Sequence, residues 1–289
     1  MAASDLFDLT GKVAVVTGGS SGLGVVFAEA LADAGAAVAV AARRADRIAD
    51  VAEKINASGG RAIAVECDVT DAASTDALMD ATIEQLGDLD VVVANAGVVA
   101  EGAIATEKIP TAIFEQTVSV NLTGTFNTAR AAAQRMLPKG SGNIITLASV
   151  AGLAASYEIP AAYGAAKAAI INLTRHMATR WGTRGIRVNA LAPGWFPSEM
   201  TDLVLGIPAF KDRLVNQTAL GRIGDPHELI GPLLLLASDA SSFMTGTTVS
   251  VDGGSSASVG ESPFPMELVE MFAQAIPDGM GAPIMPQGA

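Results

Sequence analysis

The sequence is poor in cysteine, histidine and basic residues, and each shortage excludes a kind of site or partner. Cys67 is the single cysteine among 289 residues, which excludes an intrachain disulfide and a cysteine-based zinc site. The two histidines, His176 and His227, stand far apart in the sequence, so we expect no metal site. Lys and Arg number 18 against 30 Asp and Glu, and the net charge of −12 argues against nucleic acid or an anionic membrane as a partner.

The sequence also lacks long apolar runs and a recognisable targeting signal. No run approaches the roughly 20 residues that a membrane-spanning helix requires. Two aspartates precede the first apolar run, so no secretory signal is visible and we expect a cytoplasmic protein. Hydrophobic residues nevertheless make up 50% of the chain and charged residues 17%, a composition typical of a folded domain rather than a disordered chain.

Short apolar runs alternate with longer, alanine-rich amphipathic segments. The runs are continuously apolar, as is typical of strands that are covered on both faces. The expected strands are Val13–Val16, Ala37–Ala41, Ala62–Val65, Leu89–Ala94, Asn143–Leu147, Ile186–Leu191 and Thr247–Val251. The expected helices between them include Val25–Ala34, Ala45–Ser58, Ala72–Leu86 and Ala112–Met136. This repetition predicts an α/β fold with a doubly wound, Rossmann-type parallel sheet of about seven strands and helices on both faces.

Two segments depart from this alternation. Residues Trp195–Val215 are rich in Trp, Phe, Met, Leu and Pro where another strand–helix unit is expected. Residues 255–289 contain one short amphipathic stretch, Met266–Ile276, before an irregular end. We therefore expect a single Rossmann-type domain over residues 1–254 and a C-terminal extension, a short helix and a flexible tail, over residues 255–289.

A glycine-rich turn, TGGSSGLG, follows the first expected strand directly. Gly18 permits a tight turn, Gly22 lets backbone amides approach a pyrophosphate, and Gly24 lets the next helix pack close to the strand. The amino end of that helix attracts phosphate. Such turns also occur for packing alone, but the strand–turn–helix context favours a nucleotide. The turn residues expected to contact it are Gly18, Ser20, Ser21, Gly22, Leu23 and Gly24.

The second expected strand is followed by Arg43 and Arg44, with no carboxylate at that place. A carboxylate there would hydrogen-bond the ribose 2′-hydroxyl of NAD, whereas arginine suits the 2′-phosphate of NADP. Alternatively, the two arginines only solvate the beginning of a helix. We expect NADP(H) to be the preferred cofactor, with NAD(H) possible.

Tyr163 and Lys167 are four residues apart in a strongly helical stretch, so both side chains can face one site. A phenol is a poor base at neutral pH, and a nearby cation lowers its pKa towards the value that acid/base chemistry requires. A solvated Tyr/Lys pair on a helix surface is common, so this pair alone is a weak signal.

Small polar residues and glycines end several expected strands at one edge of the sheet. Asp68–Val69 follow the third strand, Asn95–Gly97 the fourth and Ser149 the fifth. Ligands of open α/β sheets bind outside the carboxyl ends of the strands. The Ser149 hydroxyl can donate there to a carbonyl oxygen on which negative charge develops.

Taken together, these motifs resemble those of the short-chain dehydrogenase/reductase family over residues 8–255. TGGSSGLG matches the TGxxxGxG motif of the family, and Tyr163 to Lys167 match its YxxxK motif. The other matches are Asn95-Ala96-Gly97 (NAG), Asn121 and Ser149 (the active-site asparagine and serine) and Pro193-Gly194 (PG).

The resemblance implies an NAD(P)-dependent oxidoreductase that acts on CH–OH groups, transferring hydride between the nicotinamide and a ketone or secondary alcohol without a metal. It implies that Tyr163 exchanges the proton, that Lys167 tunes Tyr163 and binds the nicotinamide ribose, and that Ser149 polarises the carbonyl. Asn121 would hold a water that links Lys167 to solvent. The implied cofactor contacts beyond the turn and the arginines are Asp68, Val69, Asn95, Ala96, Gly97, Pro193, Gly194, Phe196 and Ser198.

The chain also departs from the family pattern. Ser149 and Tyr163 are 14 residues apart, where 13 is commoner. Tyr157 lies between them but has Ala161 four residues later, so it lacks a lysine partner and is rejected as the acid. The apolar Trp195–Phe210 segment favours a hydrophobic substrate, because such segments cover this site. The family resemblance also implies a homotetramer.

Two other functions remain to be weighed. A non-catalytic nucleotide-binding regulator on the same fold is expected to lose Tyr163, Lys167 or Ser149, and this sequence keeps all three. A dehalogenase of the fold is expected to lack the glycine turn and the lysine, and both are present.

Overall fold

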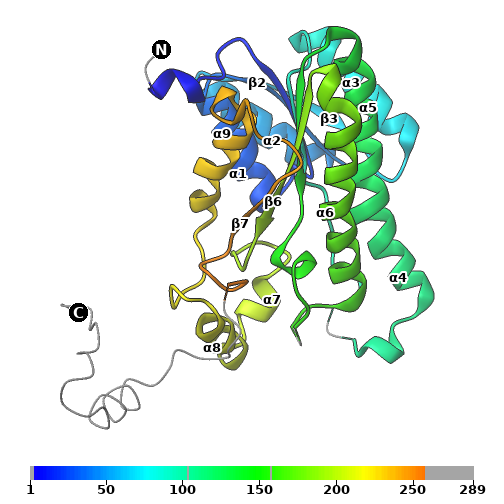
Figure 1. The fold of residues 1–289 in the computed structure, drawn as a ribbon, viewed down its shortest axis with the longest axis vertical. Coiled ribbons are helices and arrows are strands. Elements are labelled where there is room, and N and C mark those ends of the chain that lie inside the picture. Colours follow the sequence, from blue (N-terminus) through cyan, green and yellow to red (C-terminus); the bar gives the residue numbers. More distant parts are fainter. Residues whose placement is uncertain (1–2, 103, 157, 258–289) are drawn as a thin grey trace, which may run out of the picture.

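The computed structural model describes residues 3–102, 104–156 and 158–257, and it contains one parallel sheet between two layers of helices (Figure 1). The seven strands lie in the order β3-β2-β1-β4-β5-β6-β7, all parallel. They are β1 Val13–Thr17, β2 Ala37–Ala42, β3 Arg61–Glu66, β4 Val91–Ala94, β5 Gly142–Leu147, β6 Ile186–Pro193 and β7 Thr248–Val251. Every expected strand and the expected fold class are confirmed, and the strand ends differ from the predictions by at most two residues.

The helices connect the strands and cover both faces of the sheet. They are α1 Leu23–Asp33, α2 Ala45–Ala57, α3 Ala72–Leu86, α4 Thr111–Val118, α5 Gly124–Lys139, α6 Ala161–Trp181, α7 Asp202–Leu205, α8 Pro208–Gln217 and α9 Ile230–Ala237. Figure 1 shows α1 and α9 on one side of the sheet and α3, α5 and α6 on the other. Of these helices, α3 was predicted with its observed ends.

The apolar strands supply both layers of the core, as their continuous hydrophobicity predicts. Along β1, Ala14 and Val16 pack into the cluster under α1, α2 and α9, whereas Val13 and Val15 pack into the cluster under α3, α5 and α6. Successive side chains of a strand point to opposite faces, so both faces of β1 are buried. At roughly 25 cal/mol per Å² of buried apolar surface, these two layers are the main source of folding free energy.

One expected helix is interrupted. The stretch predicted as Ala112–Met136 consists of α4 and α5 joined by a π-helical turn over Ser119–Thr123. In a continuous α-helix, the Thr117 carbonyl would accept the amide of residue 121; here the Asn121 side chain donates to it at 2.8 Å. A hydrophobic pattern cannot reveal a wide turn of this kind, which is common at functional sites.

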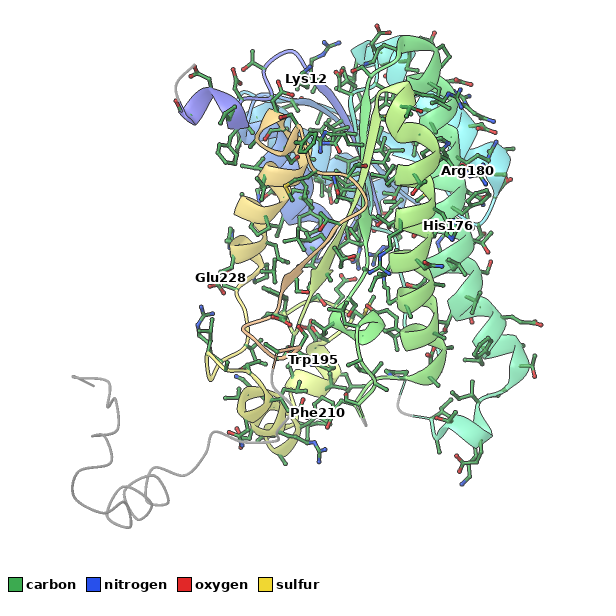
Figure 2. The ribbon with its side chains drawn as sticks, in the orientation of Figure 1. Lys12, His176, Arg180, Trp195, Phe210 and Glu228 are labelled. Carbon is green, nitrogen blue, oxygen red and sulfur yellow. The ribbon has the colours of Figure 1, made fainter. Side chains whose placement is uncertain are left out.

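The segment after β6 forms the short helices α7 and α8 below the sheet in Figure 1. Trp195 and Phe210 meet edge to face, with their ring centroids 6.0 Å apart, and Figure 2 shows both among these helices. Arg213 of α8 forms an ion pair with Glu158, which precedes α6. The aromatic contact therefore joins two parts of this segment, and the ion pair fastens the segment to the loop before α6.

Some predictions fall outside the described residues. Within them, Asp225 and Glu228 form a capping box at the start of the short helical turn Pro226–Leu229, and His176 is exposed on α6. No helix among the described residues is long and apolar enough to cross a membrane. Tyr157 and the short helix expected at Met266–Ile276 lie outside the described residues, so the division at residue 254 stays a prediction.

Candidate active site

A cavity of about 730 Å³ opens at the carboxyl ends of the strands. It lies where the strand order changes direction, because β1 leads to β2 on one side while β4 adjoins it on the other. The cavity brings together all the predicted site residues except Asn121. Those that line it are Gly18, Ser20, Ser21, Gly22, Leu23, Gly24, Arg43, Arg44, Asp68, Val69, Asn95, Ala96, Gly97, Ser149, Tyr163, Lys167, Pro193, Gly194, Phe196 and Ser198.

The glycine turn needs its glycines for steric reasons. Gly18 has a φ of 69°, and a Cβ on it would lie 2.8 Å from the Ala96 Cα. A Cβ on Gly24 would lie 2.2 Å from the Gly18 carbonyl oxygen. Gly22 is the N-cap of α1, no side chain caps this helix end, and its first residues line the cavity, so amides without an intrahelical partner lie at the cavity wall. The turn is thus shaped to admit an anionic group close to the backbone.

Asn95 fastens the end of β4 to the end of β1. Its side-chain amide donates to the carbonyls of Thr17 at 2.9 Å and Gly18 at 3.2 Å. The Thr17 hydroxyl in turn accepts a hydrogen bond from the backbone amide of Asn95 at 3.2 Å. These hydrogen bonds fix the distance between the ends of β1 and β4. Asn95 therefore has a structural role in addition to its predicted contact with the cofactor ribose.

The residues after β3 also have partners of their own. The Asp68 carboxylate accepts the amide and hydroxyl of Thr70 at 2.9 and 2.7 Å. These hydrogen bonds, and to a smaller extent the charge of Arg43, lower the pKa of Asp68. The Val69 carbonyl accepts the side-chain amide of Asn127 at 2.9 Å. The two residues predicted to contact the adenine, Asp68 and Val69, are therefore held in place by hydrogen bonds to the protein.

Of the two arginines after β2, Arg44 crosses the glycine turn. Its guanidinium donates to the Ser20 hydroxyl at 2.9 and 3.2 Å and to the Ser21 hydroxyl at 2.8 Å. It also pairs at 3.2 Å with Glu199, which belongs to the segment after β6. The two predicted serines and the predicted arginine thus form one polar group at the cavity wall, with an acidic partner that the sequence did not reveal.

Ser149, Tyr163 and Lys167 meet on the opposite wall. Ser149 hydrogen-bonds the Tyr163 side chain, and its hydroxyl also accepts the Ala151 amide at 3.1 Å. Lys167 Nζ lies 5.4 Å from the centroid of the Tyr163 ring and donates to the Leu147 carbonyl at 2.6 Å. One helix face therefore presents the phenol and the ammonium together, as their spacing predicts.

The pKa values of this group differ from the expectation. Burial raises the pKa of Tyr163 to about 12; the hydrogen bond from Ser149 opposes the rise, and the charge of Glu101 adds to it. Burial lowers the pKa of Lys167 to about 7. The expected lowering of the phenol pKa by Lys167 is not found in this structure, because desolvation penalises both charged forms.

Asn121 is fully buried in the π-helical turn rather than exposed to the cavity. Its amide donates to the Val98 carbonyl at 2.7 Å, and its oxygen accepts the Val98 amide at 3.3 Å. Asn121 thereby holds the loop that follows the NAG motif. Its predicted link to Lys167 through water stays a prediction.

Sequence reasoning missed Glu101, a buried carboxylate that is 1% exposed. Its Oε1 accepts the backbone amide of Tyr163 at 2.7 Å, and its Oε2 accepts the Thr117 hydroxyl. Glu101 thus supplies the cap that the N-cap residue of α6, Pro160, does not provide. Nothing in the local sequence signals this contact, because the partner is 62 positions away.

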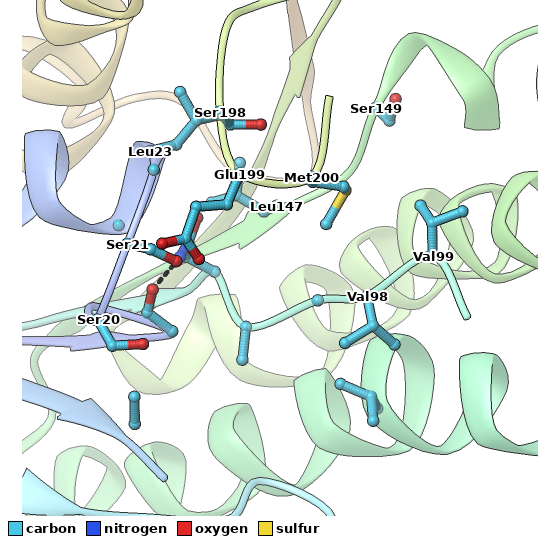
Figure 3. Close-up of a pocket in the computed structure, with 18 of the residues that line it drawn as sticks. Ser20, Ser21, Leu23, Val98, Val99, Leu147, Ser149, Ser198, Glu199 and Met200 are labelled. Atoms are coloured by element: carbon cyan, nitrogen blue, oxygen red, sulfur yellow. Dashed lines mark hydrogen bonds between the residues drawn. The ribbon is translucent and has the colours of Figure 1, made fainter. Parts of the chain in front are cut away.

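The remaining wall of the cavity is apolar. Val98 and Val99 follow the NAG motif, and Met200 and Leu203 belong to the segment after β6 (Figure 3). Phe196 is buried against Gly224, where a Cβ would collide with its ring. These side chains consequently give the cavity a hydrophobic portion of its wall.

The chain is similar to known oxidoreductases over most of its length. A family model described as enoyl-(acyl carrier protein) reductase matches residues 18–256. Gluconate 5-dehydrogenase of Gluconobacter oxydans is 38% identical over 88% of this chain and 98% of its own. Cis-4-hydroxycyclohexanecarboxylate dehydrogenase of Sinomonas cyclohexanicum is 41% identical over 84% of this chain and 96% of its own.

A solved structure is also similar. Gluconate 5-dehydrogenase from Burkholderia cenocepacia, in complex with NADP and tartrate, superposes with a TM-score of 0.86 at 36% identity, covering 89% of this chain and 100% of that one. The fold and the site thus define an α/β oxidoreductase with a dinucleotide-type cleft. The chain belongs to the short-chain dehydrogenase/reductase family.

Proposed function

We propose that the protein interconverts a hydrophobic ketone and its secondary alcohol with NADP(H), using Tyr163 as the general acid/base. The observation that carries the proposal is the meeting of Ser149, Tyr163 and Lys167 on one wall of a cleft whose other wall is the glycine turn. Relatives that are named as dehydrogenases of hydroxy compounds support the reaction class.

The residues at the cavity fit a nicotinamide dinucleotide. The turn at Gly18–Gly24 leaves room for a pyrophosphate against uncapped amides, and Arg43 and Arg44 offer positive charge to a 2′-phosphate. When bound, the cofactor supplies or accepts the hydride. The preference for NADP(H) over NAD(H) rests on these two arginines, and the NADP complex of a similar protein supports it.

In the direction of reduction, the Tyr163 phenol donates its proton to the substrate oxygen. Its pKa of about 12 keeps it protonated at neutral pH, and an alkoxide is a far stronger base than a phenolate. Ser149 donates a hydrogen bond to the same oxygen and orients it. Lys167 is fixed by the Leu147 carbonyl and has a pKa of about 7 in this structure. In its protonated form it stabilises the phenolate that remains.

We propose a neutral, hydrophobic substrate. Val98, Val99, Met200 and Leu203 line the cavity together with Tyr163. Among the described residues that line the cavity, the cations are Lys167 and the two arginines after β2, so a substrate carboxylate finds no fixed partner beyond the catalytic lysine. The substrate of this chain would then differ from gluconate.

Replacement of Tyr163 by Phe tests the reaction. We expect a loss of turnover of at least about 100-fold, since general acid catalysis contributes roughly 10²–10⁴-fold. Nicotinamide absorbance, followed with a panel of ketones and secondary alcohols, measures the rate, and titration with NADPH shows that binding is retained. Unchanged turnover in this variant would refute the assignment of Tyr163.

Two alternatives are tested by the same titrations. The reaction could use NAD(H), in which case NADH binds as tightly as NADPH. A non-catalytic nucleotide-binding regulator on this fold would bind cofactor without turning over any member of the panel.

The proposal includes a homotetramer. Apolar side chains such as the fully exposed Phe243 and the part-exposed Phe114 and Phe126 offer contact surface for other subunits. Light scattering of the purified protein measures the number of subunits.

A further inference from the structure

Glu199 lies over the glycine turn, although it belongs to the segment after β6. The neighbouring Ser198 packs so closely that a Cβ on Gly22 would lie 3.2 Å from the Ser198 Cβ. Figure 3 shows the Glu199 side chain extending towards the turn that carries Ser20 and Ser21. The segment therefore crosses the place where a cofactor phosphate would meet the backbone.

The Glu199 carboxylate is held by two arginines. Its Oε2 lies 3.2 Å from Arg44 Nη1, and its Oε1 lies 2.5 Å from Arg47 Nη1. These hydrogen bonds, first that of Arg47, lower the pKa of Glu199, so the group is an anion at neutral pH. Glu199 thus supplies a negative charge to the arginine cluster that follows β2.

Four of the five Arg44 N–H donors are engaged in this arrangement. Nε and Nη2 bind the serine hydroxyls of the turn, and Nη1 binds Glu199. A phosphate on the ribose 2′-oxygen would need the same guanidinium, because arginine recognises carboxylate and phosphate through the same planar set of donors. The two anions cannot share Nη1 without bringing like charges together.

We propose that Glu199 is a specificity-determining residue that competes with the 2′-phosphate of NADP(H) for Arg44. The inference rests on the proposed function, since it assumes that a dinucleotide occupies the cleft. NAD(H) carries a 2′-hydroxyl and leaves the ion pair between Glu199 and Arg44 intact, whereas NADP(H) must displace it. Arg43 and Arg44 raise the affinity for NADP(H) relative to NAD(H), and Glu199 therefore makes this ratio of affinities smaller.

The test measures nucleotide binding by isothermal titration calorimetry on the full chain. The probes are 2′,5′-ADP, which carries the 2′-phosphate, and 5′-AMP, which lacks it, followed by NADPH and NADH. In Glu199→Gln we expect 2′,5′-ADP to bind about 3- to 10-fold more tightly and 5′-AMP to change less than about twofold. The gain is modest because an exposed ion pair is weak. Glu199→Ala is expected to shift binding in the same direction.

Glu84→Gln serves as the matched control, because Glu84 is exposed on α3 near the end that leads into β4, away from the cleft, and carries the same charge. It is expected to leave both affinities unchanged. An equal gain in Glu84→Gln would assign the effect to net charge and overturn the proposal. An unchanged ratio of the two affinities in Glu199→Gln, or a loss of 2′,5′-ADP binding, would overturn it as well.

Different results would refute the proposed function and the competition between Glu199 and the 2′-phosphate. If the wild-type chain binds neither NADPH nor NADH, the proposed function falls and the competition falls with it. If both cofactors bind and Glu199 has no effect on their ratio, only the competition is refuted.

Discussion

The two halves of the cleft are built in different ways. The half at β1 and β4 is made from backbone, glycines and side-chain bonds to carbonyls, as in the contacts of Asn95 with Thr17 and Gly18. The half formed by the segment after β6 is made from side chains, several of them exposed: Leu203 is 82% exposed and Met200 45%. The shape of the first half is fixed by the main chain, whereas the second can change its side chains without disturbing the sheet.

This difference predicts how substitutions in each half should affect ligand binding and the stability of the fold. A substitution in the backbone-built half moves the main chain, so we expect losses of both binding and stability. A substitution in the half built by side chains leaves the core intact, so we expect it to change ligand affinity without a loss of stability. The following predictions test that contrast, starting with the largest effect.

Gly24→Ala should be severely disruptive. The added Cβ would lie 2.2 Å from the Gly18 carbonyl oxygen and 2.7 Å from Asn95 Nδ2, and a backbone oxygen cannot move without moving the turn. We expect a loss of about 1–3 kcal/mol in the free energy of unfolding, the usual cost of overpacking. We also expect at least tenfold weaker binding of NADPH, measured by titration.

Gly231→Ala is the control for this substitution. Gly231 lies in α9, and no atom lies within 4 Å of its would-be Cβ. Alanine is the better helix former, but the Pro232 ring disfavours a helical residue with a Cβ before it, so we expect these two effects to offset each other and the free energy of unfolding to change by less than about 1 kcal/mol. Similar losses in both variants would show that the turn has no special steric requirement.

Lys167→Met should change how stability depends on pH. Burial lowers the pKa of Lys167 to about 7, whereas an unfolded lysine titrates near 10.4. Between these values the unfolded chain binds a proton that the native chain does not, so the stability contributed by this group rises as pH increases from about 7 to 10. The methionine variant should lose this rise and melt a few degrees higher at pH 7.

The measurement is the Tm between pH 7 and 10, by scanning calorimetry, for the wild type, Lys167→Met and the exposed control Lys108→Met. Parallel curves for all three proteins would contradict the prediction. We also expect Lys167→Met to lose activity, but this test compares only the Tm values.

Leu203→Ala should produce the smallest effect. Because Leu203 is mostly exposed but lines the cavity, we expect the free energy of unfolding to change by less than about 0.5 kcal/mol. The KM for a bulky hydrophobic ketone should rise several-fold, while NADPH binding stays unchanged. Leu220→Ala, at a residue that is 65% exposed and not among those lining the cavity, provides the comparison. A similar rise in KM in both variants would remove Leu203 from the substrate site.

The sequence predicted the backbone-built half well because its requirements are local. Gly18 and Gly24 stand at fixed distances along one turn, and the apolar strands that carry the motifs have an unambiguous pattern. The meeting of Ser149 with Tyr163 also follows from topology, since one residue ends a central strand and the other begins the next helix.

The features that the sequence did not reveal depend on tertiary contacts. The π-helical turn at Asn121 leaves the hydrophobic pattern of its helix unchanged. The raised pKa of Tyr163 results from burial, which a motif does not encode. Glu199 meets Arg44 across 155 positions, and no local rule connects them.

The buried Glu101 has a consequence for the precision of α6. Neighbouring residues of an α-helix differ by about 100° in direction around its axis, so the aim of the Tyr163 phenol depends on the rotation of the whole helix. Glu101 holds the Tyr163 amide with one oxygen and α4 with the other, and it thereby sets this rotation at the residue where it matters. The loop that follows β4 therefore acts as the angular reference for the Tyr163 phenol, which we propose as the proton donor.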